Sequence, residues 1–409
     1  MSWTPLGPPS PPPLPAPLPV AVSFSGDRGE FRQLVERGAG LELVTIGFYR
    51  FWLATDIRRH LWSHTSVDGD AAEYTGLGRE LLVGFLFALA ILMPIYLAYF
   101  IVGLEVERFK AFASFPLFLF FYLFGQFAIY RARRYRLTRT VWRGVRFWMS
   151  GSGWAYAARS ALWGLLMLPT LGLILPWREA ALERYKMRHC YYGDLQGSFE
   201  GRGWQFFKRG WWLWLLAVVP LILVMIVLPL SKFVPVLSPP TASKIAGVVT
   251  LFIPLLAPFI YGAFKAVQWR WWLSGIRFGD VRFESTLLRG ALVSLYWKVI
   301  GWFLLLAALL AVYLFACAGL IVGVSDLSFT PGNLRGSVPM IVLAAIGYLA
   351  FILLLNVVMR VYLLRDLWAR VIGSMTVHHI EAAANVSVKG DLAGAVGEGL
   401  ADGLDVVGF

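Results

Sequence analysis

The sequence predicts a polytopic α-helical membrane protein with about six transmembrane helices in three pairs, joined by repeated cytoplasmic units of an amphipathic helix and a β-hairpin. Three observations lead to this fold class: an apolar composition, an internal repeat and a one-sided distribution of basic residues. Of the 409 residues, 58% are hydrophobic and 15% are charged, and the mean hydropathy is +0.65. Soluble domains carry about 25% charged residues, so this composition indicates a membrane protein.

Six apolar runs are each long enough to cross a bilayer as a helix, which takes about 20 residues. They lie near 82–103, 114–131, 211–231, 245–264, 291–322 and 338–359. Formal charges are almost absent from them. We group them into three transmembrane pairs, 82–131, 211–264 and 291–359.

A long internal repeat connects two segments outside these pairs. Residues 45–78 align without a gap with residues 170–203. The residues that recur at equivalent positions are Thr45, Gly47, Trp52, Arg59 and His64, which align with Thr170, Gly172, Trp177, Arg184 and His189. A repeat of this length indicates a structural unit that is used more than once. These ten residues are our candidate binding residues.

Looser copies extend the repeat to five units. The sequence around Arg134 and Tyr135 aligns with that around Arg184 and Tyr185, and a further copy runs from 270 to 286. In that copy Phe283-Glu284 comes two residues sooner than the corresponding Phe-Glu pair, which a strand tolerates because its side chains alternate with a period of two. The expected units are 23–81, 132–159, 178–210, 265–290 and a degenerate fifth within 360–409, which ends in a Gly- and Ala-rich tail.

Each unit begins with a short amphipathic helix and continues into aromatic and β-branched residues around a Gly-Asp or Arg-Gly turn. This pattern is typical of a β-hairpin. Isolated two-stranded hairpins are barely stable in water. We therefore expect the hairpins to pair with one another into a joint sheet or barrel.

Residues 160–177 form a seventh apolar stretch that fits the topology poorly as a span. A single crossing would place the two basic units on either side of it on opposite membrane faces. Pro169, Gly172 and Pro176 interrupt the stretch, and its counterpart before residue 52 is too polar to span. We interpret 160–177 as a re-entrant or interfacial segment.

Basic residues are concentrated in the repeat units, and the net charge is +13. Residues 131–159 contain arginines and no acidic residue, whereas the connectors at the other ends of the spans are short and nearly balanced. This asymmetry predicts that the repeat units and both termini lie in the cytoplasm. The expected partners are membrane lipids, whose anionic headgroups meet the basic face, and not nucleic acid.

The remaining features indicate no chemistry. Residues 1–22 are rich in proline, which predicts a disordered tail biased to the polyproline II conformation and not a signal peptide. Cys190 and Cys317 provide neither a disulfide framework nor metal-ligand spacing. His64 and His189 are expected to form hydrogen bonds within their own hairpins. We find no nucleophile elbow, phosphate-binding loop or zinc motif, and expect no enzyme, cofactor or metal.

The motifs GEFRQLVERGAGLELVTIGFYRFW, YRARRYRLTRTVWRGVRF and ERYKMRHCYYGDLQGSFEG resemble the YjgN family of bacterial inner-membrane proteins over roughly residues 23–380. The resemblance implies a multi-pass protein of the bacterial inner membrane. It implies no activity and no catalytic residues, because the family is one of unknown function.

Two functional classes remain open. Tryptophans near the expected interfaces and the basic face favour a lipid-interacting or scaffolding protein. Internal repeats and proline-interrupted spans are also features of transporters, whose substrate here would be uncharged or amphipathic because the spans contain almost no ionisable side chains.

Overall fold

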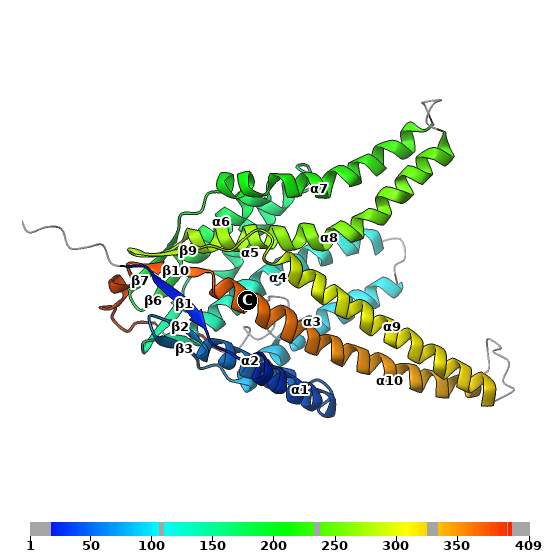
Figure 1. Ribbon diagram of the computed structural model, residues 1–409, viewed down its shortest axis with the longest axis horizontal. Helices are drawn as coiled ribbons and strands as arrows, with labels where there is room; N and C mark the ends of the chain where they lie inside the picture. Colours follow the sequence, from blue (N-terminus) through cyan, green and yellow to red (C-terminus); the bar gives the residue numbers. More distant parts are fainter. Residues whose placement is uncertain (1–17, 106–109, 233–237, 325–333, 391, 395–409) are drawn as a thin grey trace, which may run out of the picture.

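Ten short strands form one closed antiparallel barrel, and long helices project from one end of it (Figure 1). The computed structural model describes residues 18–105, 110–232, 238–324, 334–390 and 392–394. The expectations for residues 1–17, and for the end of the tail after residue 394, lie outside the described residues. The predicted pairing of the hairpins into one barrel is confirmed.

Four hairpins of equal size are contiguous in sequence. They are β2 (Thr65–Val67) with β3 (Asp70–Tyr74), β4 (Thr140–Trp142) with β5 (Val145–Met149), β6 (Cys190–Tyr192) with β7 (Leu195–Phe199), and β8 (Ile276–Phe278) with β9 (Val281–Ser285). Two-residue turns join the strands, and Asp68 and Gly69 both have positive φ, of 55° and 84°. Such turns match the twist of paired strands. Phe283 and Phe199 are not structurally equivalent: β9 has five residues, as β7 has, and Ser285 takes the register position of Phe199.

The fifth hairpin is assembled from the two ends of the chain. β10 (Met375–His378) pairs with β1 (Val20–Phe24), and Val377 lies opposite Val20. This register matches the contiguous third hairpin, in which Tyr192 lies opposite Leu195. The expected tail 1–22 was therefore too long, because its last three residues belong to a strand. Proline density ends before this strand, where Val20 to Val22 supply a β-branched pattern.

Neighbouring hairpins are joined by one repeated register. The last residue of each five-residue strand lies opposite the first residue of the next, shorter strand. These pairs are Phe24 with Thr65, Tyr74 with Thr140, Met149 with Cys190, Phe199 with Ile276, and Ser285 with Met375. The barrel thus has an approximate fivefold repeat.

Large side chains fill the barrel, and the C-terminal segment covers its outer end. Val22, Trp142, Tyr192, Val281 and Val377 are all buried in one cluster. Burying them stabilises the fold by roughly 1.5–3 kcal/mol for each large apolar side chain. Residues 380–386 contribute further apolar side chains to this cluster. The barrel is therefore a packed core and not an open channel.

In each unit, one helix runs toward the barrel and leads into its strands, and one helix runs away from it. The helices that leave are α1 (Arg28–Val44), α3 (Gly78–Glu105), α5 (Gly153–Leu165), α7 (Gly203–Leu230) and α9 (Val293–Val324). The helices that return are α2 (Arg50–Ser63), α4 (Lys110–Thr138), α6 (Leu175–Arg188), α8 (Pro239–Gly275) and α10 (Leu334–Val358), which a π-helical segment, Met359–Arg365, joins to α11 (Asp366–Ile372).

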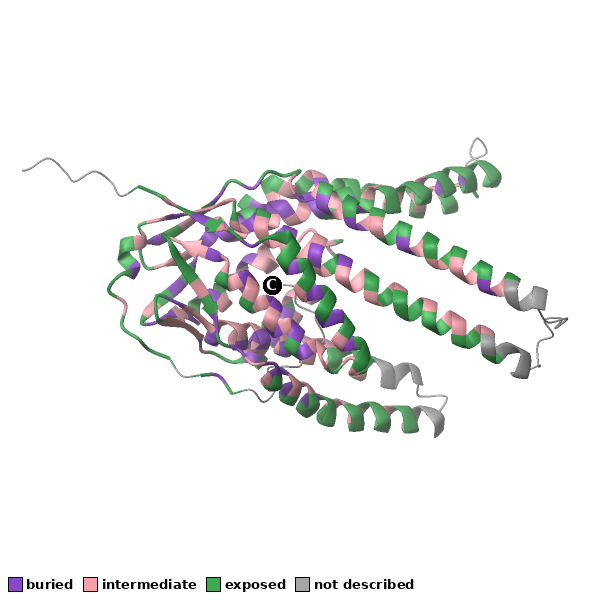
Figure 2. Ribbon diagram, turned by 60° about the horizontal axis from the view of Figure 1, so that its bottom comes forward, coloured by how far each residue is buried: buried purple, intermediate pink, exposed green. Residues whose placement is uncertain are grey.

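Three of the five helix pairs are long. The six helices α3, α4, α7, α8, α9 and the continuous helix that includes α10 are long and apolar enough to cross a membrane. Many of their apolar side chains are exposed, and Figure 2 shows that buried residues are concentrated near the barrel. Among the described residues, this confirms the prediction of six apolar helices in three pairs.

The other two pairs, α1 with α2 and α5 with α6, are short. Their helices have 13 to 17 residues. Residues 160–177 contain the end of α5, a turn at 166–174 and the beginning of α6. The chain therefore reverses direction within this segment and does not continue through it as one helix.

Candidate functional site

Thr45 and Gly47 directly follow α1, and their counterparts Thr170 and Gly172 lie in the turn between α5 and α6. The Thr45 hydroxyl donates to the carbonyl oxygen of Leu41 at 2.7 Å, and the Thr170 hydroxyl makes the equivalent bond at 2.6 Å. Gly47 and Gly172 have φ of 84° and 79°, and their N–H groups bond the carbonyl five residues earlier. This is a Schellman motif. Backbone geometry therefore accounts for both Thr-x-Gly repeats.

His64 and His189 end the second helix of each short pair. Nδ1 of each ring lies 2.7 Å from the carbonyl oxygen four residues earlier, that of His60 or Tyr185. These contacts satisfy carbonyl groups that a helix end leaves without intrahelical partners. Each histidine therefore bonds to the helix that precedes its hairpin, and not within the hairpin as expected.

Trp52 and Trp177 mark a close approach between helices. A Cβ added at Gly78 would lie 2.8 Å from the Trp52 Cα, and one at Gly203 would lie 2.9 Å from the Trp177 Cα. The repeated glycines therefore let the departing helix cross the returning helix. Arg59 donates to the Gly76 carbonyl oxygen at 2.8 Å, and its counterpart Arg184 lines a surface depression with Glu200.

The ten repeated residues do not form one site. Thr45 and His64 lie at opposite ends of α2, a helix of 14 residues that is about 20 Å long. In the second set, Thr170 and His189 likewise lie at opposite ends of α6. A binding role for these residues stays a prediction.

An apolar cavity of about 510 Å³ lies beside the short pair α5–α6. Gly172 and Pro176 line it from this pair, while α7 and α8 supply residues such as Trp211, Ala217 and Ala257. We call it the lateral cavity. The indole N–H of Trp214 on α7 donates to the Leu171 carbonyl oxygen at 2.9 Å, which holds the turn against α7.

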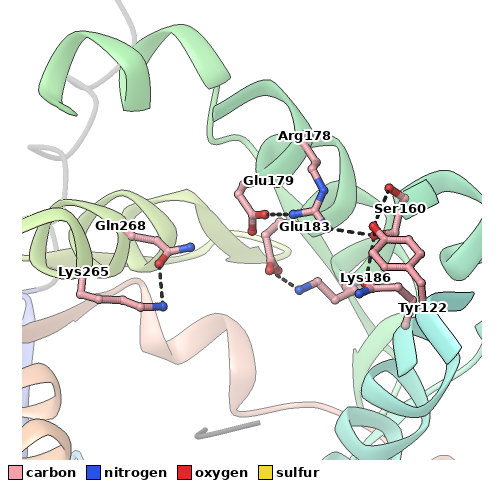
Figure 3. Close-up of polar contacts among 9 residues, drawn as sticks. Tyr122, Ser160, Arg178, Glu179, Glu183, Lys186, Lys265 and Gln268 are labelled. Carbon is pink, nitrogen blue, oxygen red and sulfur yellow. Dashed lines mark hydrogen bonds and ion pairs between the residues drawn. The ribbon is translucent and has the colours of Figure 1, made fainter. Parts of the chain in front are cut away.

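Polar residues of α6 and α8 come just after the cavity-lining residues of these helices, and Figure 3 shows the contacts among them. Arg178 binds Glu179 at 2.6 Å, and its other terminal nitrogen donates to Ser160 Oγ at 2.9 Å. On α8, Lys265 Nζ donates to Gln268 Oε1 at 3.1 Å. This is the only hydrogen-bond partner of the ammonium group among the described residues. We call Arg178, Glu179, Glu183, Lys186, Lys265 and Gln268 the polar cluster.

Glu183 is the buried centre of a charged triad. It binds Lys186 on its own helix and Arg133 on α4, the latter at 3.2 Å. Burial opposes ionisation of this carboxyl group, but the two cations outweigh burial and lower its pKa. The triad therefore remains charged and ties α6 to α4.

A second cavity of about 340 Å³ lies where the returning helices meet the barrel. Four tryptophans, Trp62, Trp269, Trp272 and Trp368, line it together with Arg133. We call it the central cavity. The indole N–H of Trp62 donates to Thr140 Oγ1 at 3.1 Å, and that of Trp368 donates to Thr65 Oγ1 at 2.9 Å. Trp62 and Trp368 are thus each held by a hydrogen bond to a threonine at a strand of the neighbouring unit.

Sequence reasoning missed both cavities and the polar cluster. The expected span ended at residue 264, directly before Lys265, although α8 continues to Gly275. One feature of the sequence could have indicated the polar cluster. Cys190 and Ile276 begin equivalent strands, so Glu179 and Lys265 occupy equivalent positions eleven residues before them (190 − 179 = 276 − 265). Opposite charges at equivalent positions of two returning helices indicate a polar contact zone.

No group of three or more His, Cys, Asp and Glu side chains within the described ranges could hold a metal ion. Cys190 is fully enclosed, and burial raises the pKa of its thiol to about 11. At neutral pH the thiol is therefore protonated and a poor nucleophile.

The family model of a bacterial protein of unknown function, DUF898, matches residues 19–298 and 239–398. The chain belongs to this family. The two DUF898 matches overlap at 239–298, as a chain of repeated units allows. No curated protein and no solved structure matches the sequence.

Proposed function

We propose that this protein is a multi-pass protein of the bacterial inner membrane that binds membrane lipids and acts as a scaffold there. The proposal rests on the lateral cavity. It is lined almost entirely by apolar side chains and lies between two helices that are long enough to span the membrane. Ligand pockets commonly measure about 300–1,000 Å³, and an apolar one at this depth suits a lipid chain.

The short helix pairs support the proposal. Their turns present apolar side chains outward: Ile46 is 91% exposed and Leu168 is 84% exposed. Ile46 and Leu171 adopt positive φ at these turns, a conformation that is costly for residues with a Cβ. Contact of these tips with the apolar part of a membrane would remove their exposed surface from water.

The proposal places the barrel and both termini in the cytoplasm. The arginine-rich units support this orientation through the positive-inside rule, and their basic face would meet anionic headgroups and not nucleic acid. The resemblance to the YjgN family supports the inner membrane. The proposal contains no catalytic step and no cofactor.

Native mass spectrometry of the protein released from nanodiscs, with identification of the retained lipids, tests the proposal. Retention of a lipid at fixed stoichiometry is the expected result. Protein that leaves the nanodisc without any retained lipid would contradict the proposal.

Transport of an uncharged or amphipathic substrate is the second candidate function. One observation favours it: α8 lines the lateral cavity through residues such as Ala257 and the central cavity through Trp269 and Trp272. A substrate could therefore contact both along one helix. Flux into liposomes that depends on the protein would support transport, and its absence for lipids and small neutral solutes would count against it.

A further inference from the structure

The walls of the lateral cavity change from apolar to charged in the same direction on two helices. Along α6, Leu175 and Pro176 line the cavity and Arg178 and Glu179 follow. Along α8, Phe264 lines the cavity, and Lys265 and Gln268 follow in the next turn. Both helices run toward the barrel, so the polar residues lie at the barrel end of the cavity. An amphiphilic molecule, with an apolar part and a polar end, matches this arrangement.

The charges at this end are not balanced. Glu179 is paired with Arg178, and Glu183 is paired with both Lys186 and Arg133. Lys265 has the neutral amide of Gln268 as its hydrogen-bond partner among the described residues, and its ammonium nitrogen lies 5.7 Å from the centre of the Tyr261 ring. Four cations therefore face two carboxylates, and the half-buried ammonium group of Lys265 carries one of the two positive charges that are left over. A charged group in a poorly solvated position is stabilised by an opposite charge that also accepts its hydrogen bonds.

We propose that the lateral cavity and Lys265 together form a binding site for one anionic phospholipid. This inference rests on the proposed function and specifies its ligand. One acyl chain occupies the apolar cavity, and the phosphate accepts hydrogen bonds from Lys265 Nζ. The Gln268 amide group adds further donors, because its oxygen faces Lys265.

Two substitutions in α8 separate the headgroup contact from the chain contact. Lys265→Gln removes the charge at the polar end. Ala257→Phe fills the cavity from α8 without changing any charge. The matched controls are Lys244→Gln, at the exposed opposite end of α8, and Leu251→Phe, whose 74% exposed side chain is outside the cavity lining.

The experiment uses native mass spectrometry of the full chain released from nanodiscs of phosphatidylglycerol and phosphatidylcholine in equal amounts. The wild type and both controls are expected to retain one phosphatidylglycerol. Lys265→Gln should lower the retained ratio of phosphatidylglycerol to phosphatidylcholine about tenfold, which corresponds to the loss of one charged hydrogen bond. Ala257→Phe should lower retention of both lipids. Unchanged melting temperatures of the variants exclude misfolding as the cause.

The outcomes separate this inference from the proposed function. A wild-type protein without bound lipid would contradict both. Lipid retained without headgroup preference, or a preference that Lys265→Gln leaves unchanged, would overturn the Lys265 site and leave lipid binding in place. Retention that Ala257→Phe leaves unchanged would show that the chain lies elsewhere, and would overturn the cavity as the site.

Discussion

Val20 lies opposite Val377 in the barrel wall, so the first described strand and the last one complete a single hairpin. β1 also pairs with β2, where Val22 lies opposite Val67. Without β1, the barrel would have two free edges, and free edges expose unpaired backbone N–H and C=O groups. The two ends of the chain therefore close the barrel together.

Val22→Asp should destabilise the protein by about 3 kcal/mol or more, because it places an unpaired charge in the barrel interior. The wild-type side chain is 5% exposed. Ala21→Asp, at the exposed neighbouring position of the same strand, is the control and should change stability by less than about 0.5 kcal/mol. Thermal unfolding in detergent measures both. Equal melting temperatures for the two variants would contradict the closure of the barrel by β1.

Gly47→Ala and Gly172→Ala should each cost about 1 kcal/mol, because both residues have φ near 80° in the turns of the short helix pairs. Gly40→Ala is the matched control, since a Cβ there meets no atom within 4 Å in helix α1. It should be neutral or stabilising by up to about 1 kcal/mol. Denaturant titration of the three variants compares them. Stabilisation by all three would contradict the turn geometry.

Glu183→Gln should destabilise the protein by about 3 kcal/mol at pH 7, because Arg133 and Lys186 lose their buried partner. The folded protein lowers the pKa of this carboxyl group, so its stabilisation is present above the unfolded pKa of about 4.3 and is lost as the pH falls below it. The difference in melting temperature between wild type and variant should therefore shrink below that pH.

Glu36→Gln is the control for this pH dependence. Glu36 binds Arg32 on the surface, where the two side chains are 46% and 60% exposed. Exposed pairs contribute at most about 1 kcal/mol. A Glu183 variant that behaves like the Glu36 variant from pH 3 to pH 7 would contradict a structural role for the buried triad.

Cysteines introduced at Ser198 and Thr241 should label from opposite sides of the membrane. Both positions are exposed, Ser198 in β7 and Thr241 at the beginning of α8. The native cysteines are buried and should react slowly. An impermeant maleimide added to spheroplasts should label Thr241→Cys and should label Ser198→Cys only after permeabilisation. The reverse pattern would invert the proposed orientation.

Local patterns made much of this fold predictable. Turns such as Asp68-Gly69 and Gly193-Asp194 identify the hairpins, because two-residue turns with positive φ restrict the sequence strongly. Long apolar runs identify the spanning helices. Both patterns involve residues that are close together in the chain, so a single sequence is enough to recognise them.

Features that depend on distant partners were not predictable. β1 is short and follows a proline-rich segment, and both of its partner strands are far away in sequence. The Thr-x-Gly repeats resembled a binding motif because repetition alone does not distinguish a turn from a site. The expected span ended before Lys265 because a hydropathy pattern ends at a charge, whereas the helix itself continues to Gly275.

Every helix pair leaves the barrel and returns to it, whether its helices have 13 residues, as in α5, or 37, as in α8. Extending a short pair until it spans, or shortening a spanning pair, would change the number of crossings by two and leave the strand order intact. The number of crossings can therefore change only in even steps while the ten strands stay together in one barrel.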